Sequence, residues 1–178
     1  CSDYTIEDLK DCAPGTVGGI YYQAATQGSY DVQIVPNFKP QTQWQYYSLR
    51  AGQTHDYEHI LTGGGFNYIG ELLPYWFRLA TIDQHIQNKE LAGEMNVMGI
   101  LGTTRYLVRT VLHYPETWGA ALKCIEQGIA IGRNSDPFWM AKMEDYWHTP
   151  LDEARRILGV RGAADLDTEA EGQIWSGL

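Results

Sequence analysis

Residues 54–71, THDYEHILTGGGFNYIGE, decide the fold because they contain the end of one helix and the start of another. Three consecutive glycines, Gly63 to Gly65, can adopt positive φ values, which end an α-helix and let the chain turn back. His55 and His59 are four residues apart, so a helix presents both imidazoles on one face. The stretch therefore predicts a helical hairpin that carries two histidines.

Glu71 lies twelve positions after His59, which on an uninterrupted helix is a rise of about 18 Å. Metal ligands lie only about 2.0–2.3 Å from their ion, so one straight helix cannot gather these groups. A turn at the glycines would instead place Glu71, in the second turn of the returning helix, opposite His55 and His59. With Asp56, the hairpin offers two imidazoles and two carboxylates.

This set of four groups is compatible with zinc, and also with iron, manganese or magnesium. If Asp56 or Glu71 is not a ligand, it becomes a candidate general base. The alternative is that both histidines are solvated surface residues and that the glycines only end a helix. The residues themselves do not choose between the metals.

Composition narrows the class of protein. The chain has 178 residues, 44% of them hydrophobic, and a net charge of −9 from 22 acidic and 13 basic residues. We expect one domain, and we expect no nucleic-acid partner because no basic cluster is present. Three cysteines without a paired spacing predict no structural disulfide, and no apolar run is long enough to cross a membrane.

Capping residues, prolines and glycines predict an all-α single-domain bundle of about six to eight helices over residues 1–162, followed by a loosely ordered acidic tail over 163–178. Residues 30–41 read as an extended connector. A first short helix is expected after Thr5, and a further one is expected to begin at Asp136-Pro137. The helix over 67–82 should have a kink or a late start because of Pro74. The other expected helices cover residues 14–28, 43–61, 90–113, 115–128 and 151–158.

The signature formed by His55-Asp56, His59 and Glu71, with Gly70 before the glutamate, resembles that of the coenzyme Q (ubiquinone) biosynthesis protein 4 family. The resemblance continues in the segment 98–102, in Gly132-Arg133, and from Trp147 to Leu158-Gly159, so it covers most of the chain. Three features depart from the family pattern. Glu58 stands where an apolar residue is expected, the loop over Gly63 to Gly65 is unusually rich in glycine, and the connection over residues 83–94 is longer than the corresponding connection in the family.

The resemblance implies that His55, Asp56, His59 and Glu71 bind a divalent metal, usually zinc, and that the same four residues form the catalytic site. It implies a metal-dependent lyase of the 4-hydroxy-3-methoxy-5-polyprenylbenzoate decarboxylase type, which removes the C1 carboxylate of the ring and replaces it with oxygen. A non-catalytic lipid-binding scaffold with a structural metal is the competing reading. A zinc protease with Asp56 as base is weaker, and a paralogue with another substrate stays open.

The resemblance also implies partners and location. The partners would be a prenylated quinone precursor or another isoprenoid lipid and other ubiquinone-biosynthesis proteins, with peripheral membrane contact and a homodimer as open alternatives. A bacterial protein would be cytoplasmic or peripheral at the inner membrane, and a eukaryotic one would lie on the matrix side of the mitochondrial inner membrane. Candidate residues for an apolar groove, for which ordinary core packing is the alternative, are Trp76, Phe77, Met95, Met98, Leu101 and Leu107.

The remaining histidines and three arginines are secondary candidates. The histidines are isolated in the sequence and are expected to be helix caps or surface residues. The arginines could bind a carboxylate or a diphosphate, with solvated helix faces as the alternative. These residues are His85, His113, His148, Arg105, Arg109 and Arg133.

Overall fold

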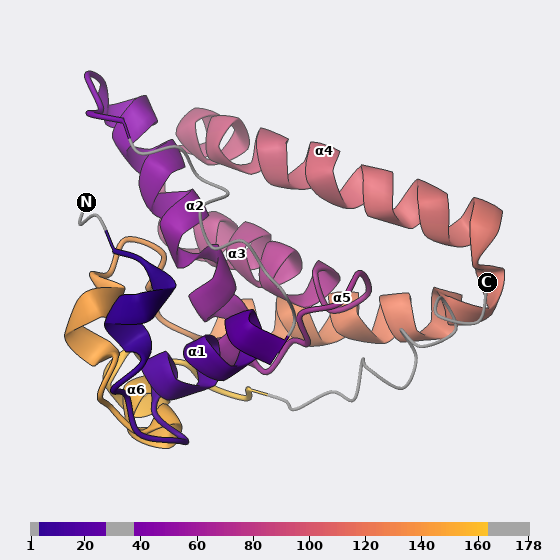
Figure 1. Ribbon diagram of the computed structural model, residues 1–178. Helices are drawn as coiled ribbons and strands as arrows, with labels where there is room; N and C mark the ends of the chain where they lie inside the picture. Colours follow the sequence, from indigo (N-terminus) through magenta and orange to yellow (C-terminus); the bar gives the residue numbers. More distant parts are fainter. Residues whose placement is uncertain (1–3, 28–37, 164–178) are drawn as a thin grey trace.

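The computed structural model describes residues 4–27 and 38–163, which form a single all-α domain (Figure 1). Within these residues it contains six α-helices and three short 3₁₀ helices, and the predicted all-α fold is confirmed. The α-helices are α1 (Val17–Gln27), α2 (Gln43–Thr62), α3 (Leu72–His85), α4 (Lys89–His113), α5 (Trp118–Asn134) and α6 (Leu151–Ile157); the 3₁₀ helices are η1 (Ile6–Leu9), η2 (Pro115–Thr117) and η3 (Met143–Tyr146).

Helix α3 is the centre of the domain. It packs most extensively against α5 and then against α4, which lie on either side of it (Figure 1). Glycines allow these close approaches, because a Cβ at Gly128 would lie 2.5 Å from Leu73 O and one at Gly132 would lie 2.5 Å from Phe77 O. On the α4 side, Gly99 faces Leu79. Small residues on α4 and α5 therefore let both helices approach α3 closely.

Several helix boundaries agree with the sequence. Thr5 caps η1 through a capping box, in which its backbone N–H donates to Asp8 Oδ2 at 2.7 Å. Helix α2 begins at the predicted Gln43 and ends at Thr62, one residue after the predicted end, and α4 ends at the predicted His113. Each of these ends has a local capping or breaking residue that the sequence displays.

Other boundaries were wrong. Helix α1 begins at Val17 rather than Pro14, because Gly15 adopts a positive φ of 81° and delays the helix. Helix α5 continues past Gly128 to Asn134, since its glycines serve packing against α3 and do not end the helix. No α-helix follows Asp136-Pro137 directly, because Asp136 N–H donates to Gly159 O and ties this segment to the end of α6.

Two predictions fall largely outside the described residues: the extended connector over 30–41, of which 30–37 is not described, and the acidic tail over 163–178, of which 164–178 is not described. Cys124 is buried in the core, 1% exposed. Among the residues described, no helix is long and apolar enough to cross a membrane.

Candidate metal centre

The two histidines are held on the last turns of α2. Thr42 begins this helix by accepting a hydrogen bond from Gln45 N–H at 3.1 Å, and Gly63 ends it with a φ of 87°. The N–H groups of Gly63 and Gly64 both donate to His59 O, at 2.9 and 3.0 Å. Of the three glycines only Gly63 adopts a positive φ, and it ends the helix as the sequence predicted.

The other glycines shape the loop around His59. His59 Nδ1 lies 2.9 Å from Gly65 O, so this nitrogen carries the proton and donates to the carbonyl. Gly70 packs against that same carbonyl, and a Cβ at residue 70 would collide with Gly65 O. The glycine before the signature glutamate is therefore required for the loop that orients His59.

Glu71 is the N-cap residue of α3, not a residue of its second turn as the sequence suggested. The reason is Pro74, which is tolerated at the third helical position, where its missing N–H would have no intrahelical partner. The late start keeps Glu71 in the turn that faces the end of α2, and Gly70 N–H donates to Asn67 Oδ1 at 2.7 Å within that turn.

His55, His59 and Glu71 form one compact cluster. His55 Nε2 lies 2.9 Å from Glu71 Oε2, and His59 Nε2 lies 3.4 Å from Glu71 Oε1. One ligand atom from each residue lies within 4.8 Å of the others, and this is the one such group of three among the described residues. Their side chains are 23%, 1% and 20% exposed, so the cluster is sheltered but open on one side.

The side chains of the cluster carry complementary charges. Burial by itself lowers the pKa of His55, but the nearby carboxylates of Glu58 and Glu71 outweigh it and raise the pKa to about 9. Burial raises the pKa of Glu71, yet the contacts with His55 and His59 outweigh it and hold that pKa well below its usual range. A cation placed among these groups would replace the imidazolium proton, so the donor set fits a divalent metal.

Asp56 is not part of this cluster. Tyr21 of α1 donates a hydrogen bond from its hydroxyl to Asp56 Oδ2 at 2.6 Å. Successive helical residues point about 100° apart, so Asp56 faces α1 while His55 faces Glu71. The structure thus gathers three of the four predicted ligands, and a role for Asp56 as ligand or base stays a prediction.

Glu58, the residue that departs from the family signature, is fully buried. Arg78 of α3 neutralises it: Arg78 Nε donates to Glu58 Oε1 at 2.9 Å, and Nη2 lies 2.7 Å from Oε2. Glu58 Oε2 is also 3.9 Å from His55 Nδ1. The carboxylate therefore lies behind His55, on the side of the ring opposite to Glu71, and it does not point to solvent.

Aromatic rings enclose the cluster. Phe66 stacks on His59 with ring centroids 5.0 Å apart, and Tyr75 lies 5.2 Å from the ring of His55. Tyr106 of α4 continues this aromatic wall, 6.2 Å from Tyr75. Burial and the negative charge of Glu71 raise the pKa of Tyr75, so its hydroxyl keeps its proton at neutral pH.

Comparison with known proteins identifies the family. The family described as coenzyme Q (ubiquinone) biosynthesis protein Coq4 matches residues 2–163, which is most of the chain. The protein belongs to the Coq4 family. A role in ubiquinone biosynthesis follows from this membership.

A crystal structure of a Nostoc punctiforme protein assigned to ubiquinone biosynthesis has the same fold as this Coq4 chain, with a TM-score of 0.68. The two chains are 21% identical over 90% of this chain and 70% of the other. No curated protein matches the chain significantly. The structural likeness supports the fold, and the family match supports the biological role.

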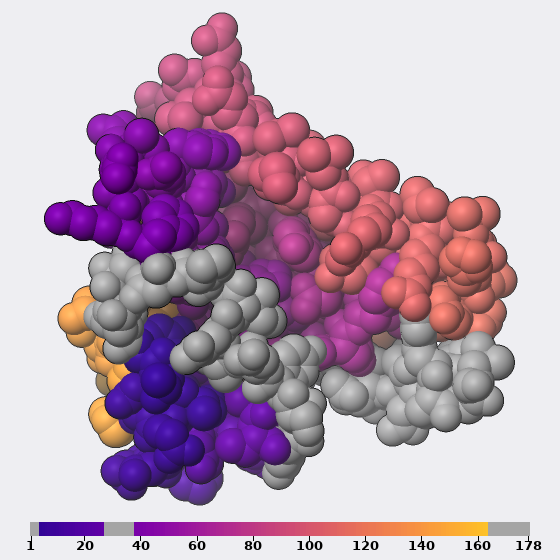
Figure 2. Space-filling model, turned by 45° about the horizontal axis from the view of Figure 1, so that its top comes forward, coloured from indigo at the N-terminus to yellow at the C-terminus, as the bar shows by residue number. Residues whose placement is uncertain are grey.

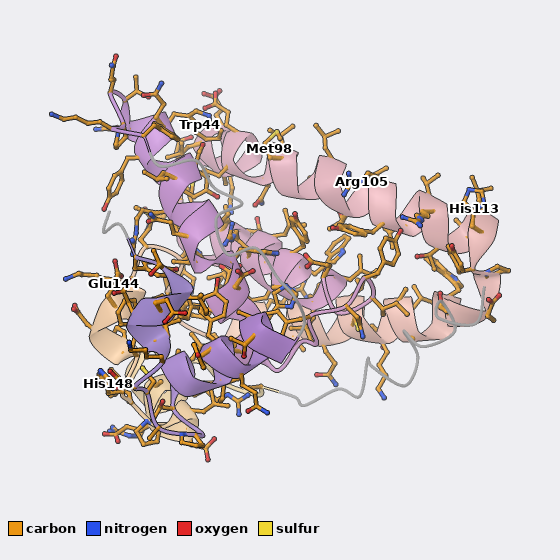
Figure 3. All side chains as sticks on the ribbon, viewed as in Figure 1. Trp44, Met98, Arg105, His113, Glu144 and His148 are labelled. Atoms are coloured by element: carbon orange, nitrogen blue, oxygen red, sulfur yellow. The ribbon has the colours of Figure 1, made fainter. Side chains whose placement is uncertain are left out.

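The other candidate residues lie apart from the cluster. His85, exposed in the last turn of α3, lies with Nε2 3.0 Å from Ser135 O just after α5, so it joins two helix ends rather than capping its own helix. His113 and His148 are exposed, at the far end of α4 and before α6 (Figure 3). Of the six candidate groove residues, Phe77 is buried in the core, whereas Met98 and Leu101 are 66% and 60% exposed, so the six do not line one groove.

Sequence reasoning missed two residues that support the site, Tyr21 and Arg78. Both lie on other helices, 35 and 20 positions from the residues they contact. The sequence contained one signal that could have predicted the role of Arg78. Glu58 stands where an apolar residue is expected, and a buried carboxylate requires a cationic partner.

Proposed function

We propose that this Coq4 protein is a metal-dependent enzyme that removes the C1 carboxylate from a polyprenylated hydroxybenzoate. The reaction is a simple decarboxylation when a proton replaces the carboxylate and an oxidative one when oxygen replaces it. The observation that carries the proposal is the convergence of His55 Nε2, His59 Nε2 and the Glu71 carboxylate on one sheltered point. Three protein ligands leave a coordination position for substrate, which is the pattern of catalytic and not of structural zinc sites. This distinction favours an enzyme over a scaffold.

The residues around the cluster fit an aromatic acid. His59 is fixed as an Nε2 ligand because its Nδ1 donates to Gly65 O. A divalent ion, zinc by family resemblance or iron, manganese or magnesium, would supply Lewis-acid stabilisation of the substrate carboxylate and phenolate oxygens. The rings of Phe66 and Tyr75 offer surfaces against which a benzoate ring could pack, and they exclude water from that side.

Tyr75 is the candidate proton donor. In the non-oxidative reaction the bond from C1 to the carboxylate carbon breaks, the electron pair stays on C1, and carbon dioxide leaves. C1 must then receive a proton, which Tyr75, whose ring lies beside that of His55 and whose hydroxyl keeps its proton, would supply. In the oxidative version C1 receives a hydroxyl group from water instead, and dioxygen takes up the electron pair and two protons and leaves as hydrogen peroxide.

We further propose that the protein works at a membrane surface, because its polyprenylated substrate would reside there, and that it meets other ubiquinone-biosynthesis proteins at that surface. In a bacterium this would be the cytoplasmic face of the inner membrane, and in a eukaryote the matrix side of the mitochondrial inner membrane. The support for this placement is the membership of a family that acts in ubiquinone biosynthesis.

The test measures metal and turnover in the same preparations. Zinc, iron, manganese and magnesium are determined by elemental analysis in the wild type, His59→Ala and Glu71→Ala, and release of labelled carbon dioxide from a carboxyl-labelled prenyl hydroxybenzoate is followed. His113→Ala, at an exposed histidine, is the matched control. We expect loss of both metal and turnover in the two site variants alone. Full metal occupancy without turnover, under aerobic and anaerobic conditions, would instead support a scaffold with a structural metal.

A further inference from the structure

Helix α4 is apolar on the face that points away from the domain. Its inner face packs on α3, where Gly102 meets Tyr75. Its outer face carries large side chains, including Met98, Leu101 and Leu112, which are 66%, 60% and 68% exposed. We call this face the outer stripe, and it consists of Glu94, Val97, Met98, Leu101, Arg105, Val108 and Leu112.

The residues of the outer stripe are exposed from Glu94 to Leu112. Figure 2 shows α4 as a ridge along one edge of the molecule, and Figure 3 shows Met98 on the side of α4 turned away from α3. An open hollow of about 530 Å³ borders its second half, with Leu101, Val108 and Leu112 in the lining. A helix that is apolar on both faces is normally buried on both faces, so a partner is expected here.

The charges of the outer stripe indicate which partner. Glu94 lies in its N-terminal half and Arg105 in its C-terminal half, both exposed. They are eleven residues apart, which is close to three helical turns, so they lie on the same line of the helix at a separation of about 16 Å. The stripe therefore has an acidic end and a basic end with apolar residues between them.

We propose that the outer stripe binds the outer stripe of a second copy of this chain, with the two α4 helices antiparallel about a twofold axis. The axis would pass between Met98 and Leu101, so that Leu101 packs on Met98 of the other copy. Glu94 of each copy then faces Arg105 of the other, which forms two ion pairs per dimer. A parallel arrangement would oppose like charges, so charge complementarity selects the antiparallel one.

The interface size agrees with overlap along most of α4. A helix of 25 residues is about 37 Å long, and stable dimers bury roughly 800 Å² from each copy. Only near-complete overlap approaches this area, and the proposed axis pairs Lys89 with Thr110, which leaves few residues unpaired. A bilayer is the weaker occupant, because it would force Glu94 among lipid tails and because the chain carries a net charge of −9.

The full chain is tested by sedimentation velocity and equilibrium over a concentration series. We expect a concentration-dependent dimer, with a dissociation constant raised about 100-fold by Leu101→Glu and about tenfold or more by Glu94→Arg or Arg105→Glu alone. The double variant Glu94→Arg/Arg105→Glu should regain most of the wild-type affinity, because the swapped charges again face each other. Lys123→Glu, an exposed charge on α5, is the control and should leave the dimer unchanged.

Each outcome bears on the proposal. Restoration by the double variant supports the antiparallel pairing, and circular dichroism and melting temperature show whether each variant remains folded. A monomer at all concentrations overturns the proposal, as does a dimer insensitive to Leu101→Glu or one that the charge swap fails to restore. Flotation of a strictly monomeric protein with vesicles of phosphatidylcholine and phosphatidylglycerol would assign the stripe to a membrane instead.

Discussion

Removing Arg78 should destabilise the protein more than any exposed charge change would. Glu58 is fully buried, and the Arg78 guanidinium contacts both of its oxygens, at 2.9 and 2.7 Å. Arg78→Leu leaves a buried carboxylate without its cation, which costs about 3–5 kcal/mol of unfolding free energy. Glu58→Leu costs less, about 1–3 kcal/mol, because Arg78 keeps hydrogen bonds to Ala51 O at 2.8 Å and Thr54 Oγ1 at 3.4 Å.

The double variant Glu58→Leu/Arg78→Leu should be within about 1 kcal/mol of the wild type, because apolar residues can replace a buried ion pair with little loss. The interaction energy from the double-mutant cycle is then about 3 kcal/mol or more. Urea unfolding of the metal-free proteins, followed by circular dichroism, measures it. The exposed pair of Lys142 and Asp145, 3.3 Å apart, provides the control Lys142→Leu, which should change little.

A cost below about 1 kcal/mol for Arg78→Leu, or simple additivity of the two single variants, would refute this reasoning. The same variants also report on the metal site, since Glu58 lies 3.9 Å from His55 Nδ1. We expect the double variant to bind metal roughly 10–100-fold more weakly, because carboxylates behind a ligating histidine orient the ring.

Three further predictions concern the site. The metal-free protein should lose stability between pH 6.5 and 9, by at most about 3 kcal/mol. The pKa of His55 is raised to about 9, so the stabilisation from its protonated form beside Glu71 is full below the unfolded pKa of about 6.5 and is lost as pH rises through 9. Unchanged urea midpoints at pH 6 and 9 would contradict this. Asp56→Asn should weaken metal binding less than Glu71→Gln, measured by chelator competition, because Tyr21 holds Asp56 away from the cluster; equal losses would make Asp56 a fourth ligand. Gly70→Ala should lower metal affinity at least tenfold through the displaced Gly65 carbonyl, and an unchanged affinity would show that the loop does not orient His59.

The sequence alone predicted the all-α fold, most helix ends and the hairpin that joins His55 and His59 to Glu71. These features are local: capping residues, a glycine with positive φ and the period of the helix act within a few residues of the positions they control. The boundary that was predicted wrongly at Gly128, in α5, shows the limit. A glycine that ends a helix and one that admits a neighbouring helix look the same in a sequence.

Tertiary structure decided what each side chain of the signature faces. Asp56 turns to Tyr21 and Glu58 to Arg78 because α1 and α3 pack on different sides of α2, and no local rule fixes that packing. The start of α3 at Leu72 likewise places Glu71 in the turn instead of inside the helix. Sequence therefore determined which groups could bind a metal, whereas the packing of three helices determined which of them converge, because convergence depends on contacts between residues far apart in the chain.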